Sequence, residues 1–366
     1  MKLSAKELGS FARLHGRTLL DPNSEILWFN WSCSGFTVRF RGKTLRARLS
    51  SIANHMVMPI FQIDTMEYPC IGIRDESQPG EGYLSRPLLE ERDAAYTLFD
   101  GAEGEHTISV IKLSENSRGK SGLMELETDG EFLPPEEVKP SLYIEVVGDS
   151  ISCGYGNEST EPGFRTQEEN GERAYGALAA KELKADYSCI AVSGCSVAAP
   201  TWLPGPDDSM GMEDMYRYTD CLLEKELGRS EYTLWDFKAK PVDAVVINLG
   251  TNDATEIKMK GFSKESIDRF ERHYEAFIES VRALNGPDTL ILCTLGSMDY
   301  YLYDNIKTVV NNYIRRTGDS RIKCRKFGGI IPFTEGIGAD THPSAATHVR
   351  MGHELAQMLR DCLGLE

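Results

Sequence analysis

One stretch of the chain decides the fold: Glu145-Val146-Val147-Gly148-Asp149-Ser150-Ile151-Ser152-Cys153-Gly154-Tyr155-Gly156. The apolar run at 142–147 predicts a short buried strand, and Gly-Asp-Ser ends that strand abruptly ahead of a glycine-rich loop. An open α/β sheet carries its chemistry at the carboxyl ends of its strands, where Ser150 would present its hydroxyl. Because a serine hydroxyl is a weak nucleophile at neutral pH, this interpretation requires a base and an anion-stabilising site elsewhere in the chain.

Downstream of this stretch, strands are expected to alternate with helices. Apolar runs predict strands at 186–192, 244–249 and 289–295. Helical spacing of apolar residues covers 173–183, 264–284 and 345–363. The alternation predicts an α/β fold over residues 136–366, with a doubly wound parallel sheet of flavodoxin-like type.

The N-terminal part follows a different pattern, of short strands separated by turns. Apolar and polar residues alternate over 36–43 and again over 45–49, which predicts a hairpin across Gly42-Lys43-Thr44. Further strand-like runs lie at 26–31, 61–64, 95–99 and 106–111. The series predicts a β-sandwich domain of jelly-roll type over residues 1–135, followed by a linker at 130–137.

The composition argues against several classes of partner. The 366 residues carry 56 Asp and Glu against 40 Lys and Arg, a formal net charge of −16, which disfavours nucleic acid and anionic membrane surfaces. No apolar run approaches the ~18 residues that span a bilayer, and the N-terminal residues lack the apolar core of a signal peptide. The nine cysteines are odd in number and form no Cys-x-x-Cys pair, so we expect free thiols, no metal site and a cytoplasmic location.

Candidate catalytic groups follow three of the predicted strands. Ser150 follows the first, Ser193-Gly194 the second and Gly250-Thr251-Asn252-Asp253 the third. The loops after parallel strands gather at one edge of the sheet, so residues a hundred apart can converge there. Gly338-Ala339-Asp340-Thr341-His342-Pro343-Ser344 adds a histidine just before the last predicted helix.

These four blocks resemble those of the SGNH (GDSL-type) hydrolases, whose serine, glycine, asparagine and histidine fall on Ser150, Gly194, Asn252 and His342. The resemblance implies serine acyl transfer without metal or cofactor. In this reaction Ser150 would attack an ester carbonyl, and His342 would take the proton of the serine hydroxyl. The backbone N–H groups of Ser150 and Gly194 and the side-chain amide of Asn252 would stabilise the oxyanion.

The extended forms of the blocks resemble carbohydrate esterase family two more closely, and the resemblance covers most of the chain. It rests on 148–156, on Trp235-Asp236-Phe237, on 246–253 and on the β-rich N-terminal part. It implies a carbohydrate O-acetyl esterase acting on small-molecule or oligosaccharide acetyl esters, such as fragments of xylan and other plant polysaccharides. Two alternatives stay open: another SGNH activity (lipase, thioesterase or a deacylase for a different sugar), or a carbohydrate-binding protein with an inert hydrolase half.

The sequence departs from the usual SGNH pattern beside the histidine. Most SGNH enzymes carry an aspartate three residues before it, where this chain has Ala339. Asp340 lies two residues before His342, and in an extended segment its side chain would point the same way as the imidazole and could orient it. Alternatively a backbone carbonyl orients the ring, which would leave a dyad. Trp202, in the loop after the glycine block, is a candidate for stacking on a sugar face or for filling a hydrophobic gap.

Overall fold

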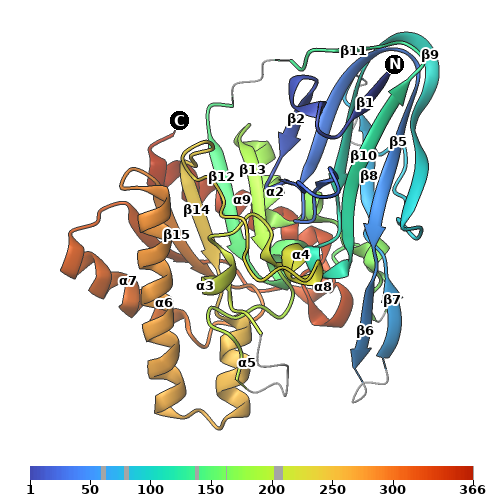
Figure 1. Cartoon of the computed structure of the whole chain (residues 1–366). Helices are drawn as coiled ribbons and strands as arrows, with labels where there is room; N and C mark the ends of the chain where they lie inside the picture. The colour runs from blue at the N-terminus through green and yellow to red at the C-terminus, as the bar shows by residue number, and fades with distance from the viewer. Residues whose placement is uncertain (59–62, 78–81, 137–139, 162, 202–208, 366) are drawn as a thin grey trace.

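Among the described residues, two large sheets and a two-stranded ribbon organise the chain (Figure 1). The computed structural model describes residues 1–58, 63–77, 82–136, 140–161, 163–201 and 209–365. The sheet of the C-terminal part has five strands, all paired in parallel. Their order across the sheet is β13 (Asp186–Ala191), β12 (Tyr143–Gly148), β14 (Ala244–Asn248), β15 (Leu290–Leu295) and β16 (Ile322–Lys326). Every residue of β12, β14 and β15 is buried, as the apolar runs predicted.

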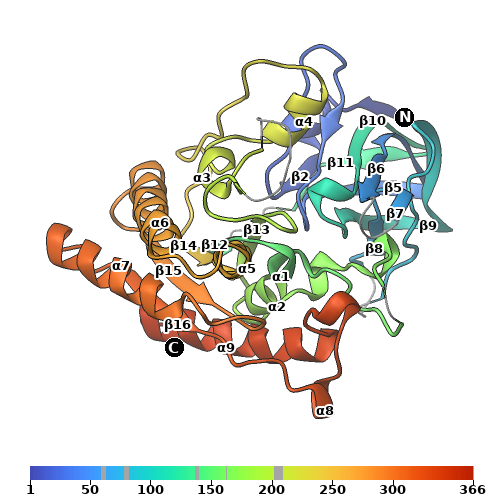
Figure 2. The ribbon, with the colours of Figure 1, turned by 90° about the horizontal axis from the view of Figure 1, so that it is seen from below.

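Helices cover both faces of this sheet (Figure 2). On one face α6 (Lys264–Asn285) and α7 (Tyr303–Thr317) pack apolar side chains against β14 and β15. On the other face α2 (Tyr175–Glu182) and α9 (Ala345–Leu363) do the same. The predicted doubly wound α/β fold is confirmed.

The N-terminal sheet is antiparallel throughout its nine strands. Its strands are β1 (Lys2–Ser4), β2 (Ala12–His15), β3 (Leu19–Leu20), β4 (Leu27–Trp28), β5 (Gly35–Ile52), β8 (Ile71–Asp75), β9 (Asp93–Lys112), β10 (Lys120–Thr128) and β11 (Glu131–Leu133). A separate ribbon pairs β6 (Asn54–Met58) with β7 (Ile63–Glu67). The predicted antiparallel N-terminal domain is present, and the jelly-roll arrangement stays a prediction.

The hairpin expected across Gly42-Lys43-Thr44 is wrong, because β5 runs through it as one strand of 18 residues. The register against β9 slips between Gly42 and Thr44, so the glycine marks a bulge rather than a turn. The backbone N–H groups of Lys43 and Thr44 donate to the carboxylate of Asp129. Likewise the runs at 95–99 and 106–111 are two parts of β9.

The two sheets are joined by buried polar contacts between the domains. Arg17, which precedes β3, forms a bidentate ion pair with Glu145 in β12, with nitrogen–oxygen distances of 2.9 and 3.3 Å. The indole N–H of Trp31 donates to the carbonyl of Thr219 at 2.8 Å. Because a buried ion pair requires a fixed geometry, these contacts set how the domains meet.

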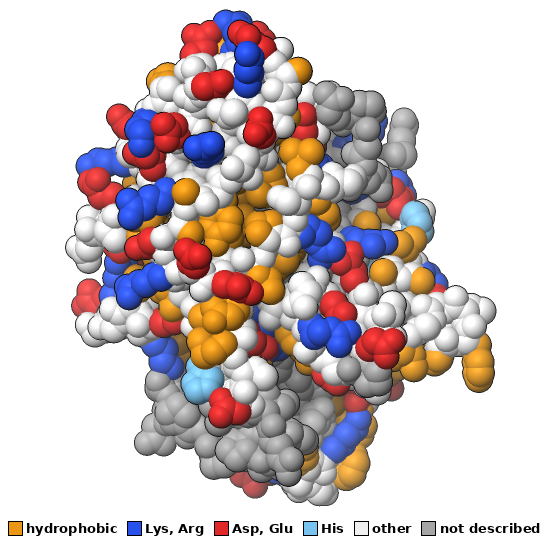
Figure 3. All heavy atoms as spheres, turned by 90° about the vertical axis from the view of Figure 1, so that its right-hand side faces the viewer, with side chains coloured by type: hydrophobic (Ala, Val, Ile, Leu, Met, Phe, Trp, Pro, Cys, Tyr) orange, Lys and Arg blue, Asp and Glu red, His pale blue; other side chains and the backbone are white. Residues whose placement is uncertain are grey.

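The charged side chains and the cysteines are distributed as the composition led us to expect. In Figure 3, basic and acidic side chains are interspersed on the face shown, rather than gathered into separate patches. All nine cysteines are free thiols. Among the described residues no helix is both long and apolar enough to cross a membrane.

Candidate active site

Ser150 is held at the carboxyl edge of the parallel sheet by a sharp strand-to-helix turn. β12 ends at Gly148 and α1 (Ser150–Cys153) begins at the serine, with Asp149 as its N-cap accepting the N–H of Ile151 at 3.0 Å. A Cβ on Gly148 would lie 2.0 Å from Ser152 Oγ, so the turn requires glycine there. The motif therefore fixes the position of the hydroxyl.

His342 meets this serine from the other end of the domain. Its Nε2 lies 2.8 Å from Ser150 Oγ, although the residues are 192 apart in sequence. The loop that carries it is fastened to the serine loop by two hydrogen bonds, from Ala339 N–H to Gly156 O at 3.0 Å and from Ala345 N–H to Asn157 O at 2.8 Å. The structure thus brings together the serine and the histidine that the sequence singled out.

Of the two alternatives for orienting the imidazole, the geometry favours a backbone carbonyl over the side chain of Asp340, whose carboxylate does not hydrogen-bond to the ring. The Nδ1 atom of His342 faces two backbone carbonyls instead, Ala339 O at 3.2 Å and Asp340 O at 3.3 Å. The Asp340 carboxylate accepts a hydrogen bond from the hydroxyl of Tyr155 at 2.8 Å. The side-chain alternative assumed an extended segment, whereas Asp340 is left-handed (φ 47°, ψ 42°) inside a 3₁₀ turn, Ala339–Thr341.

Tyr155 supports the histidine and was not singled out from the sequence, although it lies within the opening motif. Its ring centroid is 4.4 Å from that of His342 and 4.2 Å from that of Phe164, on which it stacks. The guanidinium of Arg118, from the N-terminal domain, lies over both aromatic rings. The imidazole is therefore held by an aromatic face as well as by carbonyls.

The groups expected to stabilise an oxyanion face the same cavity as the serine. Gly194 has a left-handed backbone (φ 77°), and a Cβ there would meet open space. Glycine is therefore favoured at position 194 by its left-handed backbone, and not because another group packs against its Cα. In the described part of the chain the N–H groups of Ser150 and Gly194 have no hydrogen-bond acceptor. The side-chain amide of Asn252, in the first turn of α5 (Thr251–Met259), donates to Cys195 O at 3.0 Å and to Asp149 at 3.3 Å.

The cavity around these groups has a volume of about 690 Å³ and is built by both domains. Ser150, Gly194, Asn252 and His342 all line it. The N-terminal domain contributes Asn54 and Met56 from β6, together with 117–120. Trp202 lies outside the described residues. No group of side chains suited to holding a metal ion occurs among the described residues.

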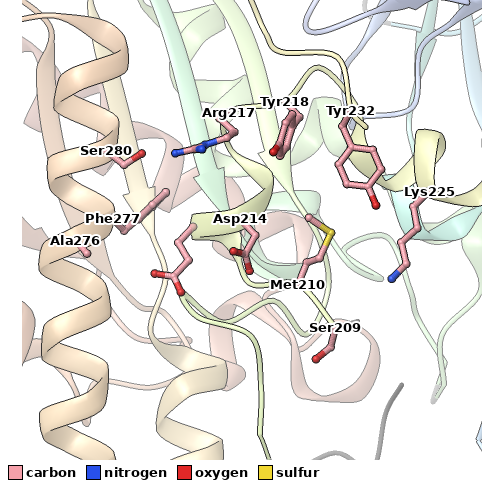
Figure 4. A pocket seen from close by; sticks show the side chains of 11 residues that line it. Ser209, Met210, Asp214, Arg217, Tyr218, Lys225, Tyr232, Ala276, Phe277 and Ser280 are labelled. Carbon is pink, nitrogen blue, oxygen red and sulfur yellow. The ribbon is translucent and has the colours of Figure 1, made fainter. Parts of the chain in front are cut away.

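A second cavity, of about 800 Å³, contains none of these groups (Figure 4). Its walls come from α6, with Ala276, Phe277 and Ser280, and from the segment that includes α3 (Met212–Met215). Acidic and basic side chains such as Asp214 and Arg217 point toward it without a nucleophile–base pair. Size alone therefore does not identify the reactive site, and geometry favours the cavity at Ser150.

The environment keeps the imidazole of His342 in its neutral form. Burial lowers its pKa, while the two carbonyls and the charge of Asp340 raise it, and the net pKa lies below the ordinary value of 6.5. Burial also raises the pKa of Asp149 to about 7. A neutral imidazole 2.8 Å from a serine hydroxyl can act as a general base at neutral pH.

Comparisons with known proteins agree with this geometry. The model of the GDSL-like lipase/acylhydrolase family matches residues 144–355. The chain is 34% identical over 272 residues to the cellulase/esterase CelE of Acetivibrio thermocellus, covering 72% of this chain and 31% of that protein. It is 28% identical over 264 residues to an acetylxylan esterase/glucomannan deacetylase of Cellvibrio japonicus, covering 71% of this chain and 68% of that one. The chain thus spans about a third of the length of the first of these relatives.

Solved structures are similar over nearly the whole chain. A family two carbohydrate esterase from Clostridium thermocellum, in complex with cellohexaose, superposes with a TM-score of 0.79 at 28% identity, covering 97% of this chain and 100% of that one. An acetyl xylan esterase from Butyrivibrio proteoclasticus gives a TM-score of 0.82 at 20% identity, covering 100% and 99%, and shares the fold. The likeness therefore includes the N-terminal sheet as well as the parallel one.

Proposed function

The chain belongs to the family of GDSL-like lipases and acylhydrolases, and from that premise we propose that it is a carbohydrate O-acetyl esterase with Ser150 as nucleophile. The observation that carries the proposal is the 2.8 Å contact between Ser150 Oγ and His342 Nε2, in a cavity that Gly194 and Asn252 also line. These are the parts that acyl transfer requires: an activated hydroxyl, a base and donors for the developing negative charge.

The reaction proceeds in two transfers. Ser150 Oγ attacks the acetyl carbonyl while His342 Nε2 takes the hydroxyl proton, and the carbonyl oxygen becomes an anion. The N–H groups of Ser150 and Gly194 donate to that oxygen, and the amide of Asn252 joins them by exchanging its 3.3 Å contact with Asp149 for the anion. The tetrahedral intermediate collapses, the sugar oxygen leaves with the proton from His342, and acetyl-Ser150 remains. Water then attacks the acetyl group, with His342 again as base, and releases acetate.

The backbone carbonyls of Ala339 and Asp340 take the place of a carboxylate in this scheme. They accept from Nδ1–H and so select the tautomer whose Nε2 is free to take the serine proton. Carbonyl dipoles stabilise the imidazolium less than a full charge would. The charge of Asp340, which also raises the pKa of the imidazole, supplies part of the difference through space.

Substrate class is supported by the cavity wall and by the relatives. The names of two relatives state an action on acetylxylan or glucomannan, and one solved relative holds cellohexaose. The cavity mixes polar side chains such as Asn54 and Ser117 with Met56 and Met298, which suits a sugar hydroxyl and a short acyl group better than a long alkyl chain. Nine free thiols support a cytoplasmic location, where imported oligosaccharides would be the substrate.

The test is a comparison of initial rates on acetylated xylo-oligosaccharides, acetylated glucomannan oligosaccharides, p-nitrophenyl acetate and p-nitrophenyl octanoate. We expect turnover of the acetyl esters and little of the octanoate, with the Ser150→Ala variant inactive on all of them. Turnover of the octanoate alone would refute the acetyl assignment. A wild-type protein that neither hydrolyses these esters nor reacts with a fluorophosphonate would instead support an inert, sugar-binding role.

A further inference from the structure

Glu115 is a buried carboxylate of the N-terminal domain that reaches the oxyanion loop of the hydrolase domain. It lies between β9 and β10, directly before a 3₁₀ turn at Asn116–Arg118, and is fully buried. Its Oε2 accepts the backbone N–H of Ser193 at 2.6 Å. Ser193 directly precedes Gly194, so a side chain of one domain restrains the loop that carries a donor in the other.

The charge of Glu115 is compensated within the same buried cluster. Arg118 Nε donates to its Oε1 at 3.0 Å, and Arg118 Nη1 also contacts both carboxylate oxygens of Glu67, at 2.8 and 3.0 Å. Burial raises the pKa of Glu115, but Arg118 and the Ser193 N–H together lower it by more than burial raises it, so the net pKa lies below 4.5. Burial and the charge of Glu115 raise the pKa of the neighbouring Glu169, so Glu115 is the ionised member of the pair.

This contact constrains the direction of the Gly194 N–H. The bond to Glu115 fixes the peptide plane between Val192 and Ser193, and the N–H of Cys195 closes the turn on Val192 O at 3.1 Å. Gly194 lies between these two restraints with a left-handed backbone, a conformation that glycine leaves easily. Without the first restraint, the peptide before Gly194 is held from one side alone, by the bond from Cys195 N–H to Val192 O.

We propose that Glu115 is a positioning residue that holds the 193–194 loop so that the Gly194 N–H points at the oxyanion, making the catalytic site dependent on the N-terminal domain. The catalytic part of this inference rests on the proposed function, whereas the restraint on the loop does not. Because the oxyanion forms only in the transition state, loss of the restraint lowers kcat and leaves KM nearly unchanged.

The experiment compares Glu115→Ala and Glu115→Gln with Asp21→Asn as a matched control. Asp21 is also a nearly buried carboxylate of the N-terminal domain that pairs with an arginine across the interface, Arg229, but it does not contact the 193–194 loop. The readouts are amide hydrogen exchange of a peptide spanning 190–196 and kcat and KM on p-nitrophenyl acetate, with melting curves to identify folded variants.

We expect faster exchange at 190–196 in both Glu115 variants, with the larger effect in Glu115→Ala, because glutamine keeps an oxygen that can accept the Ser193 N–H. Their kcat should fall roughly tenfold to hundredfold, less than the ~10²–10³ of deleting a donor outright, while KM changes less than about threefold. The control should keep wild-type exchange and kcat. Folded Glu115 variants that match the control in both readouts would overturn the inference. If the wild type lacks esterase activity, the proposed function is refuted, but the restraint on the loop can still be tested by amide exchange. Unchanged exchange at 190–196 in the Glu115 variants would refute the restraint, and faster exchange would support it. If Glu115→Ala fails to fold, Glu115→Leu, which fills more of the space and also lacks an acceptor for the Ser193 N–H, decides.

Discussion

Replacing Asp340 by asparagine separates a backbone-oriented dyad from a carboxylate triad. Asparagine tolerates the left-handed backbone of this position (φ 47°), so the change removes the charge with little conformational strain. The amide oxygen can still accept from the Tyr155 hydroxyl, which now lies 2.8 Å from the carboxylate. The perturbation is therefore confined to the charge near His342.

The expected loss of activity is small. Asp340 is exposed, and the change turns its hydrogen bond with Tyr155 from a charged into a neutral one, a difference of about 1 kcal/mol. Since about 1.4 kcal/mol corresponds to a tenfold change in rate, kcat should fall less than about tenfold. A carboxylate that directly orients a catalytic histidine typically costs about 10⁴ in kcat when it is changed to an amide.

The pH profile gives a second, independent readout. The Asp340 charge raises the pKa of His342, so its removal should lower that pKa. The base works in its neutral form, and the acid limb of kcat/KM should therefore move to lower pH. The assay is kcat and KM on p-nitrophenyl acetate across the acid range for wild type and Asp340→Asn. A thousandfold loss of kcat, or an acid limb displaced to higher pH, would refute the reasoning.

Three further changes test other parts of the account. Asn252→Ala removes a proposed oxyanion donor, so kcat should fall about 10²–10³ with KM nearly constant; steady-state kinetics check this, and a rise in KM alone would contradict it. Gly194→Ala places a Cβ in open space but on a left-handed backbone, so we expect about 1–2 kcal/mol of strain. The melting temperature and kcat should therefore both drop. An unchanged melting curve would argue against the strain. His348 is fully buried, and its pKa is lowered from 6.5 to about 3 by burial and then by His342. The unfolded chain therefore binds a proton that the folded protein excludes, and stability is lost as pH falls below about 6.5. In His348→Gln the melting temperature should fall less between pH 7 and pH 5 than in the wild type. An equal fall in both proteins would exclude a contribution of His348 to the acid loss of stability. Part of the acid loss should remain in the variant, because burial also lowers the pKa of His15, to about 4.

The parallel half could be predicted because its signals are local. A strand buried on both faces is apolar throughout, as 244–249 is, and a long amphipathic helix repeats its apolar face, as 345–363 does. Parallel strands then place the loops after them at one edge, which is why Ser150 and Asn252 could be expected to meet. The strand β16 was missed because charged residues interrupt its apolar run. The helix α7 was also missed, although Ile306, Val309, Val310 and Tyr313 repeat an apolar face at helical spacing.

The remaining features depend on information that a linear pattern does not contain. Alternation with period two is the same in one long strand as in two strands of a hairpin, so β5 was divided at Gly42. The direction of the Asp340 side chain depends on a left-handed φ that the spacing to His342 does not reveal. Tyr155 and Glu115 act through contacts with distant segments, and in the case of Glu115 with the other domain.

The most direct test of the account is the mass of the protein quenched during turnover of p-nitrophenyl acetate, followed by mapping of the modified peptide. The account predicts one acetyl group on Ser150, absent in Ser150→Ala and formed much more slowly in His342→Ala. Turnover by the wild type without acetylation of Ser150, or full activity in Ser150→Ala, would contradict the claim that these loops assemble a serine nucleophile.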